Sequence, residues 1–276
     1  MKTWNYRVKI CVVGCGAIGS RIAKSVAKDL NKDCRITGLF DTDREKVTKL
    51  AKSLKVESKY CDDNLDQLIK NSDCVVEAIN TPHTKEIVER AIKHKKSVLV
   101  MSVGKMLEEE ELFNLARKNK CYILLPSGAI AGIDAIKAAS LASIKKVNLI
   151  TRKPPAGLAG NPYFVKKGID LNSIKKETVV FEGNVREAVK HFPQNINVAA
   201  TIALAAQSLS KLNIKIMTSP KYTSNSHEVE VSGDFGSIKS LTDNVPCPDN
   251  PKTSYLAVLS GIQTLKQYCT GILIGT

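Results

Sequence analysis

Three glycines near the start of the chain have the spacing of a phosphate-binding turn. They lie between an apolar run at residues 8–13, which is rich in β-branched side chains, and a segment at 20–27 with apolar residues at helical spacing. In this context the first glycine allows a tight turn, the second admits a pyrophosphate, and the third lets the helix pack on the strand. The helix N-terminus then offers N–H groups to the phosphates. The predicted dinucleotide-binding residues are Gly14, Gly16, Ala17, Ile18 and Gly19.

An acidic residue follows at the distance expected for a contact with ribose. A second apolar run at residues 34–40 ends at Asp41, about 20 residues after the last glycine. A carboxylate there accepts hydrogen bonds from the hydroxyls of an adenosine ribose, which favours NAD as the cofactor. Arg44 lies shortly after it and could bind a 2′-phosphate, so the sequence leaves NADP open.

The segments that must position these residues alternate between strand and helix patterns. Short apolar runs typical of buried strands recur at residues 74–79, 97–101 and 121–125. Helical spacing occurs at residues 43–55, 65–69, 85–94 and 108–119. This alternation predicts an α/β fold, a doubly wound parallel Rossmann sheet with right-handed crossovers. Ligands of such sheets bind beyond the carboxyl ends of the strands, so we expect the loops at 80–83 and 102–105 to line the nicotinamide end.

Beyond residue 125 the pattern becomes that of an α+β domain. Small residues at 126–132 indicate a hinge. Strand patterns follow at residues 147–152, 178–182, 213–218 and 227–232, and helix patterns at 134–142 and 198–209. They predict a mixed sheet with its helices on one face. We expect the last helix, at residues 254–268, to pack back against the first domain.

The length of 276 residues suits two domains of ordinary size. We predict a dinucleotide-binding domain at residues 1–125, completed by residues 245–276, and a substrate and dimerisation domain at 126–244. No apolar run approaches the ~20 residues of a membrane span. The first strand follows closely on the N-terminus, which leaves no room for a secretory signal and favours the cytoplasm.

Cysteine usage and net charge narrow the function further. The eight cysteines form no C-x-x-C pair and no pairing with histidine at zinc-ligand spacing, so neither a disulfide scaffold nor a metal site is expected. The net charge of +14 attracts nucleic acid in principle. The lysines are scattered, however, and the aromatic content is 5%. We therefore do not expect nucleic-acid binding as the main function, although an anionic substrate would benefit from the charge.

Several segments of the chain resemble, in order, the signature segments of the L-aspartate dehydrogenase family. They lie at residues 126–134, 151–155, 192–201, 225–229 and 250–254, and the glycine turn matches as well. The resemblance covers nearly the whole chain. It implies NAD(P)-dependent oxidation of L-aspartate to iminosuccinate, with reductive amination of oxaloacetate as the reverse, and a homodimer. In this family the imine can feed quinolinate synthesis, the start of NAD production.

The resemblance also assigns roles to particular residues. It implies that His227 is catalytic and that Ala129 and Asn197 contact the cofactor, with Asn195 as the nearest competitor of Asn197. Asn197 can also be interpreted as a helix N-cap. A base of near-neutral pKa would help to deprotonate the substrate amine, and histidine has the unperturbed pKa for it. His83, at a predicted strand end, is the alternative base.

The other candidates stay open at this stage. His94 is expected at a solvated helix end and His191 in a loop. The substrate carboxylates need cationic partners, for which Lys105, Arg152 and Lys153 are candidates. A homoserine-dehydrogenase-like or dihydrodipicolinate-reductase-like oxidoreductase would share the domain plan. A non-catalytic NAD-binding sensor with a basic surface is the alternative outside enzymes.

Overall fold

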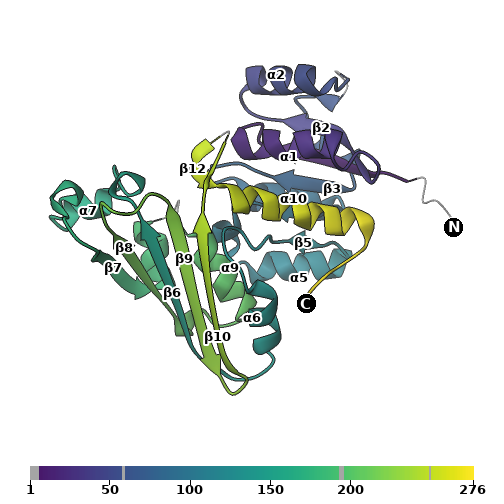
Figure 1. Cartoon of the computed structure of the whole chain (residues 1–276). Coiled ribbons are helices and arrows are strands. Elements are labelled where there is room, and N and C mark those ends of the chain that lie inside the picture. The colour runs from purple at the N-terminus through teal and green to yellow at the C-terminus, as the bar shows by residue number, and fades with distance from the viewer. Residues whose placement is uncertain (1–5, 58–59, 193–195, 249) are drawn as a thin grey trace. The chain divides into compact units, whose positions relative to one another are not determined.

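The computed structural model describes residues 6–57, 60–192, 196–248 and 250–276. The chain divides into two compact units (Figure 1). The first comprises the chain up to residue 126 together with residues 258–273, and the second comprises residues 127–257 and 274–276. Each unit has its own sheet and its own buried side chains.

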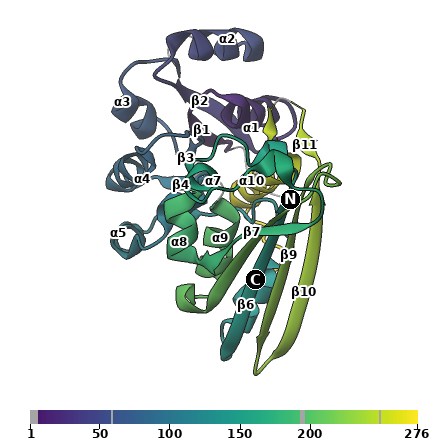
Figure 2. The same ribbon diagram turned by 90° about the vertical axis from the view of Figure 1, so that its left-hand side faces the viewer.

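The first unit is a parallel α/β sheet covered by helices. Its elements are β1 (Val8–Val13), α1 (Ala17–Lys28), β2 (Cys34–Phe40), α2 (Arg44–Leu54), α3 (Leu65–Lys70), β3 (Cys74–Glu77), α4 (Thr84–Lys93), β4 (Ser97–Val100), the 3₁₀ turn η2 (Val103–Met106), α5 (Glu110–Asn119), β5 (Ile123–Leu124) and α10 (Tyr255–Thr270). The strand order is β2-β1-β3-β4-β5, and every neighbouring pair is parallel. Helices α1 and α10 lie along one face, and α3, α4 and α5 along the other (Figures 1 and 2). The predicted doubly wound sheet is confirmed.

Local sequence explains why these elements form. The strands β3 and β4 are buried along their whole length, as continuous apolar runs in a sheet covered on both faces should be. Helix α2 begins where the Asp43 side chain accepts hydrogen bonds from the backbone N–H groups of Glu45 and Lys46. It ends at Lys55, whose left-handed backbone stops the helix.

The C-terminal helix completes the core of the first unit. Leu265 of α10 is fully buried in the same apolar cluster as Ile22 and Val26 of α1. The predicted division differs at residues 245–257, which belong to the second unit and include the first three residues of α10. There β11 (Pro246–Cys247) pairs with β12 (Asn250–Ser254), and the backbone N–H of Tyr255 donates to the Val245 carbonyl at 2.9 Å.

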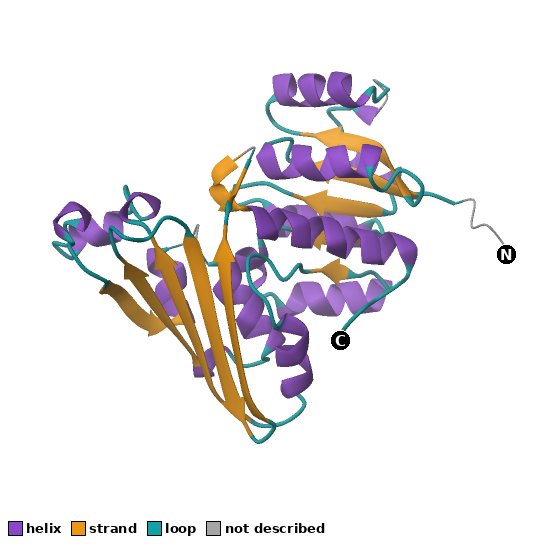
Figure 3. Ribbon diagram, in the orientation of Figure 1, coloured by secondary structure: helices purple, strands orange, loops and turns teal. Residues whose placement is uncertain are grey.

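The second unit is built on a mixed sheet. Its remaining elements are α6 (Ile133–Ala139), β6 (Ile144–Lys153), η3 (Pro155–Gly157), α7 (Pro162–Lys166), η4 (Leu171–Ser173), β7 (Thr178–Asn184), α8 (Val185–His191), α9 (Asn197–Ala205), η5 (Leu209–Lys211), β8 (Leu212–Thr218), β9 (Asn225–Gly233) and β10 (Gly236–Asn244). The strand order is β10-β9-β6-β8-β7, in which β6 and β8 are parallel and the other pairs antiparallel (Figure 3). Helices α6, α8 and α9 cover one face of this sheet (Figures 1 and 2). The predicted mixed sheet with helices on one face is confirmed.

Several elements of this unit have no counterpart in the sequence expectations, among them β10 and α8. The edge strand β10 had no predicted counterpart, because its residues are mostly exposed or half-buried and its apolar alternation is weak. Helix α8 was also missed, although Asn184 and Glu187 form a reciprocal capping box at its start. His191, expected in a loop, is the last residue of this helix. Its ring packs among Tyr163, Phe181 and Phe192.

Candidate functional site

The residues 14–19, which we call the glycine turn, connect β1 to α1 in a form that only glycine allows at two positions. Gly14 has a φ of +98°, and a Cβ added there would lie 2.5 Å from the Ala78 carbonyl oxygen. A Cβ on Gly19 would lie 1.8 Å from the Gly14 carbonyl oxygen. A Cβ on Gly16, by contrast, would meet nothing within 4 Å. The turn is therefore closed toward the protein and open above Gly16, as a pyrophosphate site requires.

The first turn of α1 is equipped to receive an anion. Gly16 is its N-cap and supplies no side-chain hydrogen bond, and no acidic side chain lies in the first turn. The leading N–H groups and the positive end of the helix dipole are thus left for a ligand. Ala17 and Ile18 begin the helix and are half-buried. These features fit the diphosphate of a nicotinamide dinucleotide.

Asp41 at the end of β2 holds the glycine turn in place. Its carboxylate accepts hydrogen bonds from the backbone N–H of Cys15 at 2.7 Å and from that of Asp43 at 2.9 Å. A carboxylate has about four acceptor positions, so two remain for ribose hydroxyls. Arg44 is engaged elsewhere: it forms an ion pair with Asp63 at 2.7 Å and donates to the Cys61 carbonyl at 2.8 Å.

A buried carboxylate that the sequence analysis did not single out organises the ends of β3 and β4. Glu77 is fully buried and accepts hydrogen bonds from the Ile79 N–H at 3.2 Å, the Thr84 hydroxyl at 3.1 Å and the Ser102 N–H at 3.1 Å. Burial raises its pKa, and these bonds oppose that shift. Glu77 therefore connects the two loops predicted to line the nicotinamide end. The sequence signal that could have revealed Glu77 is the presence of an acidic residue inside an apolar run.

In the second unit, buried and half-buried polar side chains gather at one end of the mixed sheet, on the face that carries the core. We call this group the polar end. Its members are the buried Thr151, Thr218, His227 and Asn244 and the half-buried Lys153 and Thr242. The sheet register brings them together: His227 lies opposite Thr151 on one neighbouring strand and opposite Thr242 on the other, and Lys153 lies opposite Thr218. Directly opposed residues share a face of the sheet.

His227 is buried and held at one nitrogen. Its Nδ1 lies 3.0 Å from the Thr151 hydroxyl. Burial, and secondarily the charge of Lys153, lower the pKa of His227 to about 3. The imidazole is therefore neutral near physiological pH. With Nδ1 occupied by Thr151, Nε2 is the nitrogen left for a ligand.

Ala129 is bound to the same group of residues. Its carbonyl accepts hydrogen bonds from the Asn244 side-chain N–H at 3.1 Å and from the Thr242 hydroxyl at 3.2 Å. The Thr242 hydroxyl also lies 3.2 Å from the His227 carbonyl. Within the described residues the other side-chain atom of Asn244, Oδ1, is buried without a hydrogen-bond partner. An unpaired buried acceptor is unfavourable, which suits a place where a ligand donates a hydrogen bond.

The structure separates the three candidate cations. Lys153 belongs to the polar end, and burial lowers its pKa to about 8. Arg152, the residue before Lys153, points to the opposite face of the sheet and forms an ion pair with Glu228 at 2.8 Å. Lys105 lies in η2 of the first unit and is exposed.

Asn197 opens α9, and its carbonyl accepts a hydrogen bond from the Thr201 hydroxyl at 2.9 Å. The N-cap of this helix is Ile196, so the interpretation of Asn197 as an N-cap is wrong. The helix extends one residue further back than its apolar pattern indicated. Asn195, the competitor of Asn197, lies outside the described residues.

The alternative histidines have surface partners. His83 precedes α4, is exposed, and its Nδ1 lies 3.3 Å from a carboxylate oxygen of Glu86. His94 ends the same helix, with its Nε2 3.2 Å from Asp66. Of the four histidines, His227 is the one placed among buried polar side chains that converge from several strands.

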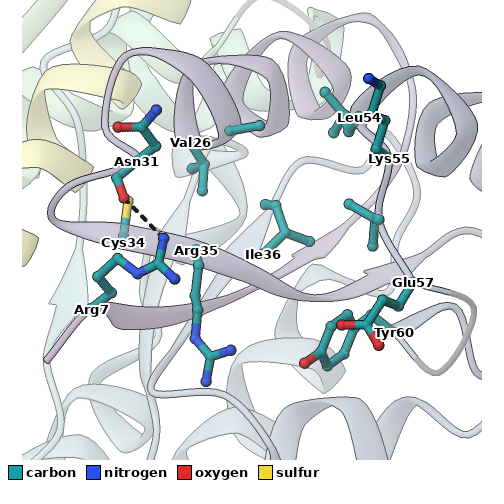
Figure 4. A pocket seen from close by; sticks show the side chains of 12 residues that line it. Arg7, Val26, Asn31, Cys34, Arg35, Ile36, Leu54, Lys55, Glu57 and Tyr60 are labelled. Carbon is teal, nitrogen blue, oxygen red and sulfur yellow. Dashed lines mark hydrogen bonds between the residues drawn. The ribbon is translucent and has the colours of Figure 1, made fainter.

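A separate cavity of about 310 Å³ lies at the amino ends of β1 and β2 (Figure 4). Arg7, Arg35, Ile36 and Leu54 are among its lining residues, and Arg7 donates to the Asn31 carbonyl at 3.2 Å. Ligands of parallel sheets bind at the carboxyl ends of the strands, so this cavity is not the predicted cofactor site.

Comparisons with known proteins bear on both units. Residues 134–268 match the family "Aspartate dehydrogenase, C-terminal", and residues 14–126 match "Homoserine dehydrogenase, NAD binding domain". The L-aspartate dehydrogenase of Methanosarcina barkeri is 43% identical over 272 residues, which cover 98% of this chain and 100% of that protein. The chain belongs to the L-aspartate dehydrogenase family. A further member of this family, from Methanocella arvoryzae, is 38% identical over 97% of the chain.

Solved structures agree with this membership of the L-aspartate dehydrogenase family. The crystal structure of aspartate dehydrogenase from Thermotoga maritima is 25% identical, with a TM-score of 0.73, and the match covers 98% of this chain and 100% of that one. Scyllo-inositol dehydrogenase from Lactobacillus casei, solved with NAD(H) and scyllo-inositol, is 14% identical with a TM-score of 0.54, which shows a shared fold. The predicted family and fold class are confirmed. In the described part of the chain, no helix is both long and apolar enough to cross a bilayer, and no three potential metal ligands cluster.

Proposed function

We propose that this protein oxidises L-aspartate to iminosuccinate with NAD⁺ and that His227 is its catalytic base. The observation that carries the proposal is a buried, neutral imidazole at the polar end of a chain that also has a complete glycine turn. Full-length relatives named L-aspartate dehydrogenase support the substrate. The nicotinamide, when bound, accepts a hydride from the substrate α-carbon.

The role of His227 follows from the proton balance of this oxidation. Loss of hydride from the α-carbon requires a neutral amine, so a base must take a proton from the substrate ammonium. One C–H and one N–H bond break and a C=N bond forms; the hydride goes to the cofactor and the proton to His227. The imidazole accepts it at Nε2 when Nδ1–H donates to the Thr151 hydroxyl, 3.0 Å away. The negative charge of a bound dicarboxylate raises the pKa of His227 toward the range of a useful base.

The remaining parts of the proposal concern the cofactor. The glycine turn binds the diphosphate and Asp41 binds the adenosine ribose. We assign NAD rather than NADP, because a carboxylate beside the ribose repels a 2′-phosphate, and because Arg44 is engaged with Asp63 and Cys61. Ala129 and Asn197 contact the cofactor, as the family resemblance implies.

The resemblance also guides what we propose for the wider setting. The second unit serves substrate binding and dimerisation, the protein is a homodimer, and its imine supplies the synthesis of quinolinate. Light scattering of the purified protein tests the dimer directly. A monomer at micromolar concentration would rule it out.

Initial rates of NAD⁺ reduction test the activity. We expect turnover with L-aspartate and none, or very little, with D-aspartate, L-homoserine or L-glutamate. Oxaloacetate with ammonia should drive the reverse reaction and oxidise NADH. Turnover of L-homoserine without turnover of L-aspartate would replace this proposal by a homoserine dehydrogenase, the enzyme whose NAD-binding domain resembles residues 14–126.

A further inference from the structure

The placement of Lys153 gives the polar end a second functional group. Lys153 is the last residue of β6, two positions after Thr151, so both side chains lie on the face that carries His227. The Thr218 hydroxyl donates to the Lys153 carbonyl at 2.8 Å, and Thr218 is itself fully buried. This bond fixes the end of the strand from which the lysine side chain extends.

The charge of Lys153 reaches His227. It is one of the two causes that hold the imidazole deprotonated, the other being burial. Two groups able to carry positive charge, the buried His227 and the half-buried Lys153, thus share one end of the sheet, and the other members of the polar end are neutral threonines and an asparagine. Such an arrangement favours the binding of an anion, because buried charge is stabilised by an opposite charge at hydrogen-bond distance.

We propose that the ammonium group of Lys153 binds a carboxylate of the dicarboxylic substrate beside His227, an assignment that rests on the proposed function. The bound carboxylate offsets the lysine charge. The pKa of His227 is then higher than in the free protein, so the imidazole accepts a proton from the substrate amine more easily. Lys153 is thereby a substrate-binding residue that also makes the base effective only when a substrate is present.

Arg152 provides a matched control for this assignment. It precedes Lys153 directly, carries the same charge and belongs to the same strand, but it points to the other face. There it forms an ion pair with Glu228 at 2.8 Å. Removing either cation changes the net charge of the protein equally, so a difference between the two variants reports position rather than charge.

Calorimetric titration with succinate, in protein saturated with NADH, measures the contact without turnover. We expect Lys153→Met to weaken succinate binding about 10- to 100-fold, as expected for a lost charge-assisted contact. Lys153→Arg should retain part of the affinity, and Arg152→Met should stay within about twofold of the wild type. Wild-type affinity in Lys153→Met, or an equal loss in Arg152→Met, would overturn the inference. The affinity for NADH, measured on each variant, shows that the protein is folded.

A second substrate identifies which carboxylate is bound. L-2-Aminobutyrate keeps the α-carboxylate of aspartate but has a methyl group in place of the side-chain carboxylate. If Lys153→Met lowers kcat/KM for L-aspartate alone, the lysine holds the side-chain carboxylate; if both substrates lose equally, it holds the α-carboxylate. Both outcomes support the inference, whereas unchanged kcat/KM for both contradicts it. A wild-type protein that binds succinate through Lys153 but never oxidises L-aspartate would instead disprove the proposed function.

Discussion

The glycine turn consists of neighbouring residues in one segment, whereas the polar end gathers side chains from four strands. The turn offers backbone N–H groups and open space above Gly16, and it contains no group that must titrate. The polar end offers a buried imidazole and the ammonium of a half-buried lysine, and desolvation lowers the pKa of both. Backbone N–H groups are suited to bind a group that does not change during a reaction, such as a diphosphate. Titratable side chains in a desolvated site are suited to a substrate group that gains or loses a proton.

The largest expected effect tests the chemical role of the polar end. Replacing His227 by alanine should lower kcat roughly 10²- to 10⁴-fold, the usual range for a lost general base. NADH affinity should remain close to that of the wild type. The rates are measured with L-aspartate at saturating NAD⁺, and His83→Ala serves as the control, because that histidine is exposed. A normal rate in His227→Ala would remove the residue from its assigned role.

A contrast within the glycine turn tests the opposite mode of binding. Gly16→Ala should leave the melting temperature nearly unchanged, because the added Cβ meets no protein atom within 4 Å. It should still weaken NADH binding at least tenfold, or about 1.4 kcal/mol, by obstructing the pyrophosphate. Gly19→Ala should destabilise the fold by several kcal/mol, because its Cβ would lie 1.8 Å from the Gly14 carbonyl oxygen. Thermal melts and NADH titrations separate the two effects.

The pH dependence of succinate binding sharpens the view of the polar end. Lys153 has a pKa of about 8 in the free protein and binds a carboxylate only when protonated. The affinity should therefore fall as the pH rises above 8, by up to tenfold per pH unit. His227, the other titratable member of the polar end, is already neutral over that range. In Lys153→Arg the decline should vanish; a decline in that variant identical to that of the wild type would assign it to another group.

The last test concerns stability in acid, where the effect of one residue is spread over several pH units. His227 has a pKa of about 3 in the folded protein, against 6.5 for an unperturbed histidine, so between these pH values the unfolded state binds one more proton. Stability should therefore fall as the pH drops from 6.5 toward 3, by up to about 1.4 kcal/mol per pH unit from this residue alone. Denaturant unfolding of the wild type and His227→Gln should show a shallower slope in the variant. Parallel curves would mean that the buried imidazole is protonated in the native state.

A region can be predicted from the sequence when it depends on residues that are close together in the chain, and less well when it depends on contacts between distant residues. The strands β1 and β2 lie where their apolar runs indicated, and Asp41 directly follows β2. These features depend on residues close together in the chain. The pairing of Thr151 with His227 spans 76 positions and depends on the register of β6 against β9, which no local pattern reveals.

Neighbouring residues illustrate the same limit. Arg152 and Lys153 were equivalent candidates in the sequence, and alternation along a strand places them on opposite faces. Which of the two faces inward follows only once β6 is known to pair with β8 and β9 in the observed register. The edge strand β10 places Thr242 and Asn244 in the polar end. Its alternation of apolar and polar residues is too weak for the strand to be predicted from the sequence.

The double use of Asp41 has a consequence for redesign of coenzyme preference. Its carboxylate, which we propose binds the ribose, also accepts a hydrogen bond from the Cys15 N–H at 2.7 Å, so it stabilises the loop proposed to bind the diphosphate. Replacing Asp41 by a small neutral residue, the obvious route to NADP, would remove this hydrogen bond, destabilise the loop and lower the affinity for both NAD and NADP. Engineering should leave this aspartate in place and recruit a cation from the start of α2, where Arg44 would first have to be released from Asp63.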